Sequence, residues 1–345
     1  MHTIDLKSKG FRTDLVIDEI TREKDSEIKP KIVEKTKNIS VEEVVIDKKI
    51  KTNWNKKDGI YETISFVDIT DKNNFKEVED IAVKTLKKML EELKIEKQAK
   101  VLIIGLGNES STPDALGPKT IDHVLVTRHL FLLGEVENGY RNVASFKPSV
   151  TGITGIETKD LIESIKDKIS PDLLIVIDAL ASSSIERLNK TIQITTAGIS
   201  PGSGVGNNRL EISKDTLKIP VIAIGVPTVV DGATIVENTI QLLLKKISYQ
   251  LDNKDNEKLK LVPMTSQNYL KHTKELTKEQ KEDLLGMVGL LDEQELKSLI
   301  LEVLLPINYN MMVTPKEIDY LIDKLSLLLG NMINKSLHEH FNPTN

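Results

Sequence analysis

Val101-Leu102-Ile103-Ile104-Gly105 is a continuous apolar run rich in β-branched side chains. Two further runs of this kind follow, at residues 173–177 and 221–224. Such runs are typical of strands that helices cover on both faces, as in a parallel sheet. They therefore predict an α/β fold with an open, mostly parallel sheet flanked by helices.

Apolar residues at helical spacing surround these runs. They predict helices over residues 75–97, about 118–132, about 157–169 and about 232–251. Thr154 and Glu157 have the spacing of a capping box, which would start the third of these helices. Before the first helix, alternating stretches at 41–46 and 60–66 predict peripheral strands.

The C-terminal part of the chain is predicted to be mostly helical. A capping residue stands three positions before Glu or Gln in three places, namely Thr277 with Gln280, Asp292 with Glu295, and Thr314 with Glu317, where Pro315 suits a first helical turn. We therefore expect an α/β core over about 75–250 and a helical C-terminal part over about 265–340.

Composition excludes several classes of protein. The chain has 345 residues, a net charge of −5 and no cysteine. A dedicated nucleic-acid binder usually carries a strongly basic face, so we expect no direct nucleic-acid partner. The lack of cysteine excludes a disulfide scaffold and a thiolate nucleophile, and it fits a reducing compartment. The apolar runs are shorter than the roughly 18 residues of a membrane span, so a cytoplasmic protein without a membrane partner is predicted.

Three aspartates stand at or just beyond the ends of the apolar runs. In open α/β sheets ligands bind beyond the carboxyl ends of the strands, where Asp114, Asp178 and Asp231 are expected. Asp231 precedes a helix and is well explained as its N-cap. Asp178 directly continues an apolar strand, where a carboxylate is costly unless it is paired or functional. Two carboxylates that converge from neighbouring loops can share one proton and act as acid and base.

Two other motifs are weaker. Residues 105–110 resemble a dinucleotide fingerprint, but Ser110 replaces the third glycine and Pro113 interrupts the helix that should follow. Residues 198–202 have the spacing of a serine nucleophile elbow, with Ser200 at its centre. The next residue, Pro201, has no N–H to donate to an oxyanion, so a serine hydrolase is disfavoured.

Histidine spacing gives no metal site. His338 and His340 are two residues apart, which does not place both on one helical face, and His123 and His129 would diverge around their helix. We therefore predict no metal and no cofactor. A metal-dependent peptidase that uses the same aspartates is kept as an alternative, as is a non-catalytic α/β assembly subunit.

The segment Thr112-Pro113-Asp114-Ala115-Leu116-Gly117-Pro118, followed by residues 126–130, resembles the germination protease family of endospore-forming bacteria. Further blocks resemble segments of that family in the same order along almost the whole chain: residues 12–15, 152–158, 177–181, 198–207, 225–231 and 313–319.

This resemblance implies an aspartic-type endopeptidase that initiates the degradation of small acid-soluble spore proteins during germination. Its fold would be similar to that of the hydrogenase-maturation proteases, and it would form a homotetramer in the spore core. The aspartates held responsible in the family fall on Asp114 and Asp178.

The family is made as a zymogen that removes its own N-terminal segment. The resemblance therefore implies a propeptide of residues 1–14, cleaved between Asp14 and Leu15, and a peptidase domain of residues 15–345. We further expect Gly202, Gly204 and Gly206, in a glycine-rich loop, to line the substrate cleft.

Overall fold

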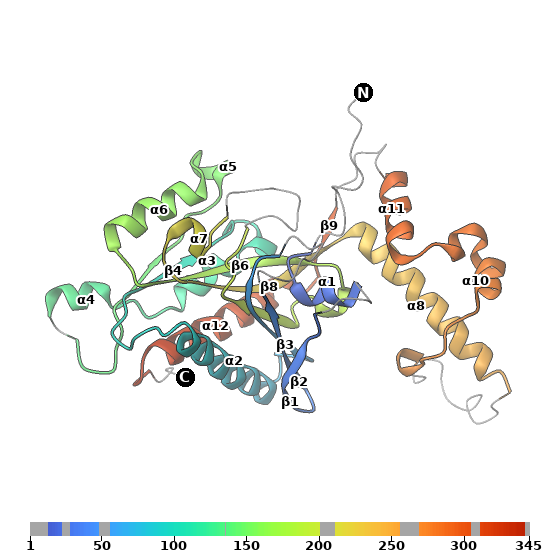
Figure 1. The fold of residues 1–345 in the computed structure, drawn as a ribbon, viewed down its shortest axis with the longest axis horizontal. Coiled ribbons are helices and arrows are strands. Elements are labelled where there is room, and N and C mark those ends of the chain that lie inside the picture. Colours follow the sequence, from blue (N-terminus) through green and yellow to red (C-terminus); the bar gives the residue numbers. More distant parts are fainter. Residues whose placement is uncertain are drawn as a thin grey trace. The chain divides into compact units, whose positions relative to one another are not determined.

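The structure is a computed structural model that describes residues 13–22, 28–47, 56–134, 136–200, 211–255, 269–304 and 311–341. The chain divides into two compact units. The larger unit comprises residues 12–229 and 314–345, and the smaller comprises residues 1–11 and 230–313. Figure 1 shows the elements of both.

The strands described form one mixed sheet in the order β1-β2-β3-β7-β8-β6-β4-β5, with β9 paired to β8. The strands are β1 (Lys31–Lys35), β2 (Ile39–Ile46), β3 (Gly59–Phe66), β4 (Val101–Gly105), β5 (Val143–Phe146), β6 (Leu173–Ser182), β7 (Thr191–Thr195), β8 (Val221–Asp231) and β9 (Met312–Val313). The α/β class with an open sheet is confirmed. β4 pairs in parallel with β6, as the apolar runs predict, and also with β5. β1, β2, β3 and β7 pair antiparallel, and β8, the third apolar run, pairs antiparallel with β7, so the sheet is mixed rather than mostly parallel.

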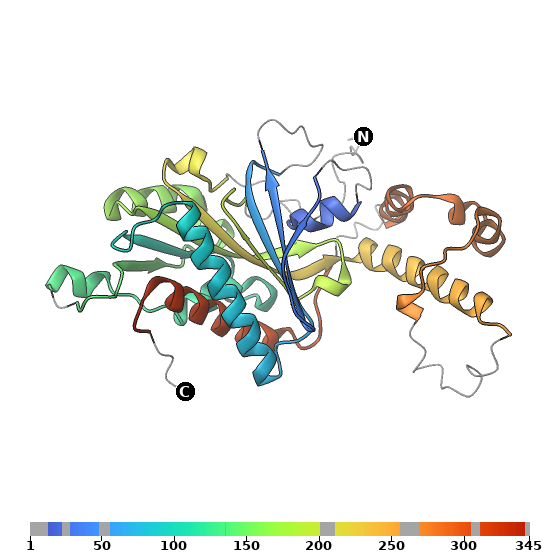
Figure 2. The same ribbon diagram turned by 60° about the horizontal axis from the view of Figure 1, so that its bottom comes forward.

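One face of this sheet carries the main hydrophobic core of the larger unit. Helices α2 (Lys72–Glu92), α3 (Leu116–Asp122) and α12 (Ile318–Leu337) pack there against alternate strand residues such as Ile103 and Ile175. α2 and α12 lie side by side (Figures 1 and 2). The C-terminal helix α12 therefore belongs to the α/β core.

The opposite face of the same strands is covered mainly by α6 (Thr158–Ile169) and α7 (Lys214–Leu217). Leu102, Leu174 and Val176 point to this face and pack with Ile162 of α6. Because neighbouring side chains of a strand alternate between faces, coverage on both sides requires an apolar residue at every position. This explains the continuous runs in the sequence.

The remaining elements of the larger unit are short. They are α1 (Val16–Arg22), a 3₁₀ turn η1 (Thr112–Asp114), α4 (Arg128–Leu133), α5 (Thr151–Thr154) and η2 (Ile185–Arg187). The smaller unit contains α8 (Gly232–Asp252), η5 (Tyr269–Lys271), α10 (Lys278–Leu285), η6 (Gly286–Leu290) and α11 (Glu293–Leu304), and its α8 packs against α11.

The predicted single helix over 118–132 is wrong, because α3 ends at Asp122 and α4 begins at Arg128. Tertiary hydrogen bonds hold the chain between them out of a helix. Thr127 donates to the carbonyl of Arg141 and accepts from the N–H of Val143 at 2.9 Å. The N–H of Leu125 donates to Asn334 of α12 at 2.8 Å.

Two predicted capping pairs are wrong, although α6 itself spans almost the predicted residues. α6 has Glu157 as its N-cap, and the hydroxyl of Thr154 bonds instead within its own turn, to Ile156. α12 begins at Ile318 rather than after Thr314, whose hydroxyl donates to the carbonyl of Thr228 at 2.8 Å. The capping pairs Thr277 with Gln280 and Asp292 with Glu295 are confirmed.

Candidate active site

Asp178 lies inside strand β6 rather than after its end. Its side chain is only 6% exposed, and it shares a face of the strand with Leu174 and Val176. One carboxylate oxygen accepts the N–H of Ala179 at 3.0 Å. A carboxylate among apolar neighbours is expensive to bury. Its place in an otherwise apolar strand therefore marks this position as functional or specifically compensated.

Asp114 is held by the loop that follows β4. It ends the 3₁₀ turn η1 and is half-buried, and its carboxylate accepts the N–H of Asn108 at 2.8 Å. Gly107 has a φ of +116°, and a Cβ atom there would lie 2.0 Å from the carbonyl oxygen of Asp114. Glycine is therefore required for the loop to close on itself around this aspartate.

The sheet brings the loop of Asp114 next to the strand of Asp178. β4 pairs in parallel with β6, with Gly105 opposite Ile177, and the N–H of Leu106 donates to the carbonyl of Ile177 at 2.8 Å. The turn η1 contacts β6 directly. The two aspartates thus belong to adjacent segments at the carboxyl end of β4, as the sequence analysis expected.

Two threonines hold the turn η1 against the sheet. The hydroxyl of Thr228 in β8 donates to the carbonyl of Pro113 at 2.7 Å, and the hydroxyl of Thr314 donates to the carbonyl of Thr228. We consider both to be positioning residues for Asp114. Sequence reasoning missed them, although both stand in blocks that carry the family resemblance.

The N-terminal segment lies along β6 just beyond the candidate aspartate. The N–H of Asp14 donates to the carbonyl of Ala181 at 2.9 Å, and the N–H of Ala181 donates to the Asp14 carboxylate at 2.9 Å. Leu15 is fully buried and packs with Ile17 and Leu180. The predicted cleavage position between Asp14 and Leu15 is therefore three residues along the strand from Asp178.

The N-terminal segment is also fixed by Asp18 of α1. The Asp18 carboxylate pairs with Arg187 at 2.8 Å and accepts from the hydroxyls of Thr13 and Ser182. The N–H of Val16 donates to Gln193 at 2.8 Å. Residues from Thr13 onward are thus integrated into the larger unit. Phe11 and most of the predicted propeptide lie outside the described residues.

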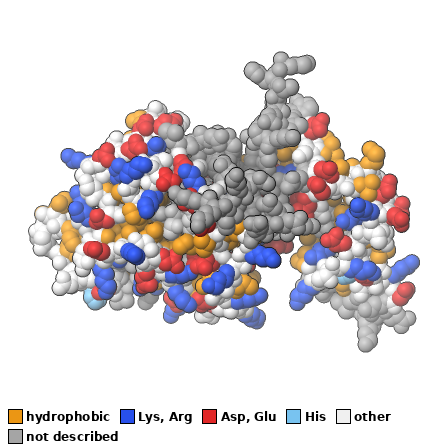
Figure 3. All heavy atoms as spheres, viewed as in Figure 1, with side chains coloured by type: hydrophobic (Ala, Val, Ile, Leu, Met, Phe, Trp, Pro, Cys, Tyr) orange, Lys and Arg blue, Asp and Glu red, His pale blue; other side chains and the backbone are white. Residues whose placement is uncertain are grey.

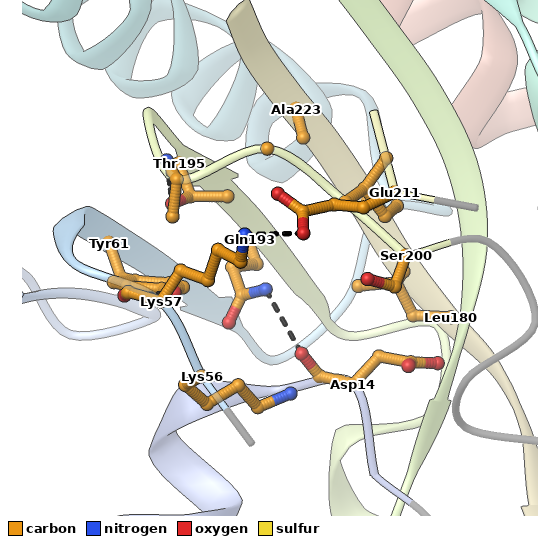
Figure 4. Close-up of a pocket in the computed structure, with 14 residues that line it drawn as sticks. Asp14, Lys56, Lys57, Tyr61, Leu180, Gln193, Thr195, Ser200, Glu211 and Ala223 are labelled. Carbon is orange, nitrogen blue, oxygen red and sulfur yellow. Dashed lines mark hydrogen bonds and ion pairs between the residues drawn. The ribbon is translucent and has the colours of Figure 1, made fainter. Parts of the chain in front are cut away.

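A pocket opens beside this segment (Figure 4). Asp14, Leu180 and Ser200 line it, and an ion pair between Lys57 and Glu211 closes one side. Gln193 donates to the carbonyl of Asp14 at 3.3 Å within it. The pocket shares residue Leu180 with the strand of Asp178, so it lies next to the candidate site.

The serine motif at residues 198–202 has no histidine partner in this pocket, because no described histidine lines the cavity that contains Ser200. His338 accepts the N–H of Arg141, and His340 lies against Gly139, whereas His272 contacts Ser248 in the smaller unit. The predicted substrate-cleft residues Gly202, Gly204 and Gly206 lie outside the described residues.

Asp231 has the structural role predicted for it. It is the N-cap of α8, and its carboxylate accepts the N–H of Thr234 at 2.8 Å. It also forms a buried ion pair with Lys297 of α11 at 2.9 Å. Burial by itself would raise the pKa of Asp231, but the charge and hydrogen bond of Lys297, with the hydrogen bonds of Thr234, lower it overall.

Within the described parts of the chain, no three or more His, Asp or Glu side chains are grouped as metal ligands. Nor does any described helix combine the length and apolarity needed to span a membrane. On the face seen in Figure 3, Lys and Arg side chains are interspersed with Asp and Glu side chains and do not gather in one basic area.

Comparison with known proteins identifies the class. A family model described as germination protease matches residues 12–345. Germination proteases of Bacillus cytotoxicus and of a Geobacillus species are each 42% identical to the chain over 99% of its length, covering 97% and 98% of those proteins. A Bacillus cereus germination protease is 43% identical, with the same 99% of this chain covered.

These matches define the class of the protein as a peptidase. The chain belongs to the germination protease family, which confirms the resemblance inferred from its sequence.

Proposed function

We propose that the chain is an aspartic-type endopeptidase in which Asp114 and Asp178 form the catalytic pair. The observation that carries this proposal is the burial of Asp178 inside β6, a strand that contacts the turn η1 in which Asp114 lies. Two carboxylates that share one proton avoid placing two negative charges in a poorly solvated site.

The pair would act by general acid and base catalysis. The ionised carboxylate takes a proton from a water as the water attacks the peptide carbonyl, and the protonated carboxyl donates a proton to the leaving amine. The N–H of Asn108 holds the carboxylate of Asp114 within its loop, and the hydroxyl of Thr228 fixes the loop to β8 through Pro113.

The substrates we propose are the small acid-soluble proteins of spores, cleaved in the spore core during germination. Family membership and the chain's likeness to named germination proteases support this substrate class. The readout is direct, because purified enzyme incubated with an acid-soluble spore protein should yield a small set of fragments by mass spectrometry.

We also propose that the enzyme is made as a zymogen and assembles as a homotetramer. The pairing of Asp14 with Ala181 supports a leader that lies along β6 close to Asp178. Sedimentation equilibrium of the purified protein measures the assembly, and a monomer at micromolar concentration would contradict the tetramer.

The catalytic pair is tested by Asp114→Asn and Asp178→Asn. Each substitution should lower kcat by about 10²–10⁴-fold, because general acid–base catalysis contributes that much and both carboxyls are needed. The matched control is Asp80→Asn on the exposed side of α2, which should leave kcat unchanged. Circular dichroism checks that each variant folds.

Near wild-type turnover in either folded variant would overturn the aspartic assignment. A parallel assay after exhaustive chelation separates this mechanism from a metal-dependent one that uses the same side chains. Activity that survives chelation supports the aspartic type. Activity that is lost on chelation and restored by zinc or another divalent ion supports the metal-dependent alternative.

A further inference from the structure

The edge of β6 that faces β4 becomes open beside Asp178. β4 pairs in parallel with β6 only as far as Gly105, which lies opposite Ile177. β6 itself continues to Ser182, and its other neighbour in the sheet is β8. In the part of the chain that the structure describes, no strand therefore pairs with β6 on the β4 side from Asp178 onward.

The backbone hydrogen bonds show which residues face this open edge. The carbonyl of Ile177 accepts the N–H of Leu106, on the side of β4. The N–H of Leu174 points the other way and donates to the carbonyl of the residue before β8. Because the backbone groups of successive strand residues point to alternate sides, Ala179 and Ala181 present their N–H and carbonyl groups to the open edge.

The N-terminal segment already occupies the far part of this edge. The N–H of Asp14 donates to the carbonyl of Ala181, and the N–H of Ala181 donates to the Asp14 carboxylate, both at 2.9 Å. Ser183, further along the same edge, donates its N–H to the carboxylate of Asp18 at 2.8 Å. Beyond Ala179, the edge is thus held by residues of the N-terminal segment.

Ala179 lies on the edge between the end of β4 and the N-terminal segment. It is partly exposed, whereas its neighbours Asp178 and Leu180 are buried. Its N–H donates to the carboxylate of the preceding residue, Asp178, at 3.0 Å. An incoming carbonyl that accepts this N–H releases the Asp178 carboxylate from it, and a carboxylate so released is available for proton transfer.

We propose that an extended segment of the protein substrate binds to this edge as an added strand. It bonds to the N–H and carbonyl of Ala179 and, once the N-terminal leader of residues 1–14 is gone, to those of Ala181. This binding mode rests on the proposed peptidase function. Strand addition suits an extended peptide, because the backbone supplies the hydrogen bonds. Neighbouring strands lie about 4.8 Å apart, which places the substrate backbone next to Asp178.

The side chains of an added strand alternate between the two faces of the sheet. Every second substrate side chain therefore points to the face that carries Asp178 and Leu180, where the pocket of Figure 4 opens. Asp14 lines the same pocket. A leader in place and a substrate bound along the whole edge therefore exclude each other at Ala181.

A backbone N-methyl scan of a peptide substrate tests the added strand. An enzyme preparation that cleaves an acid-soluble spore protein is given a peptide that covers one cleaved bond, with one N–H methylated at a time outside that bond. Methylation at two positions, two residues apart, should each lower kcat/KM by about tenfold, because these N–H groups bond to Ala179 and Ala181. The residue between them should tolerate methylation, because its N–H points away from β6.

The scan separates the binding mode from the proposed function. Cleavage of the unmethylated peptide with no alternation along the scan would overturn the added strand and leave the peptidase assignment intact. Failure of the purified enzyme to cleave either the spore protein or the unmethylated peptide would contradict the proposed function, and the binding mode with it.

The leader supplies a second test of the shared edge. A synthetic peptide of residues 1–14 should inhibit the same enzyme competitively, raising KM without lowering kcat. Asp14→Ala in this peptide should weaken inhibition by about tenfold, because the acceptor for the N–H of Ala181 is lost. The matched control, Asp5→Ala, removes the same charge elsewhere in the peptide and should leave inhibition unchanged. Inhibition that lowers kcat without raising KM, or equal weakening by both substitutions, would contradict a shared edge.

Discussion

Asp178 is a single residue whose position in a strand points to a candidate functional site. Positions 173–177 fill both faces of the sheet with apolar side chains, and the strand then continues through a buried carboxylate. Hydrophobic burial explains the neighbours of Asp178 but not the carboxylate itself. Asp178 could therefore be selected as a candidate from the sequence alone, whereas the contact of its strand β6 with the turn that carries Asp114 could not.

The serine of the elbow motif gives a prediction at the same scale. Ser200→Ala should retain most of the activity, because no described histidine lines its pocket and Pro201 has no N–H for an oxyanion. The measurement is kcat on an acid-soluble spore protein, together with labelling by a fluorophosphonate. Stoichiometric labelling at Ser200 would reverse this interpretation.

Among the elements, α8 shows how a cap and an ion pair combine. Asp231 caps the helix through Thr234 and also pairs with Lys297 of α11, so one carboxylate joins two helices of the smaller unit. Because the folded-state pKa of Asp231 is lowered, its contribution to stability is present above the ordinary pKa of 3.8 and is lost as the pH falls through the folded value.

Asp231→Asn should therefore lower the free energy of unfolding by about 2–4 kcal/mol at pH 7, since it leaves Lys297 buried without its countercharge. The difference from wild type should narrow below pH 3.8. Urea titrations of both proteins across this range measure it. Burial raises the pKa of Glu237 on the same helix, so Glu237 has the opposite effect on the pH dependence of stability. This effect is common to both proteins and cancels when the stability of Asp231→Asn is subtracted from that of the wild type.

The control for this experiment is Asp283→Asn in α10, where the side chain is exposed. It should change stability little at any pH. A difference between Asp231→Asn and wild type that stays constant from neutral to acid pH would show that the charge of Asp231 does not contribute.

Close packing of α3 against the segments of β4 and β6 depends on Gly117. A Cβ atom on Gly117 would lie 2.2 Å from the carbonyl oxygen of Leu106 and 2.7 Å from that of Ile177. Only glycine allows α3 to approach β4 and β6 this closely. The helix after η1 is thereby seated on the two strands that position the aspartates.

For the whole molecule, removal of the N-terminal leader, residues 1–14, tests the zymogen proposal. A variant that starts at Leu15 should cleave an acid-soluble spore protein faster than the full chain, because it lacks the Asp14 pairing along β6. Leu15 and Ile17 stay in the chain, so their buried packing with Leu180 should keep the processed form folded.

Asp14→Ala in the full chain separates loosening of the leader from its removal. It should raise zymogen activity, because the bond from Ala181 to the carboxylate is lost while the chain stays whole. Asp80→Ala on α2 is the matched control. Full-length protein as active as the variant starting at Leu15 would show that the leader does not inhibit.

The sequence by itself determined the α/β class, five strands of the sheet and several helix caps. These features depend on residues close together in the chain, such as the apolar runs and the pairing of Thr277 with Gln280. It also selected Asp114 and Asp178, because a polar residue next to an apolar run is visible without knowing the fold.

Only the tertiary structure decided which distant residues meet. The bond from Thr228 to Pro113 spans 115 positions, and the pairing of Asp14 with Ala181 spans 167. The break between α3 and α4, where Thr127 bonds to the carbonyl of Arg141, has no local signal. Each depends on how complete elements pack, and packing free energy outweighs the weak local preference for continuing a helix.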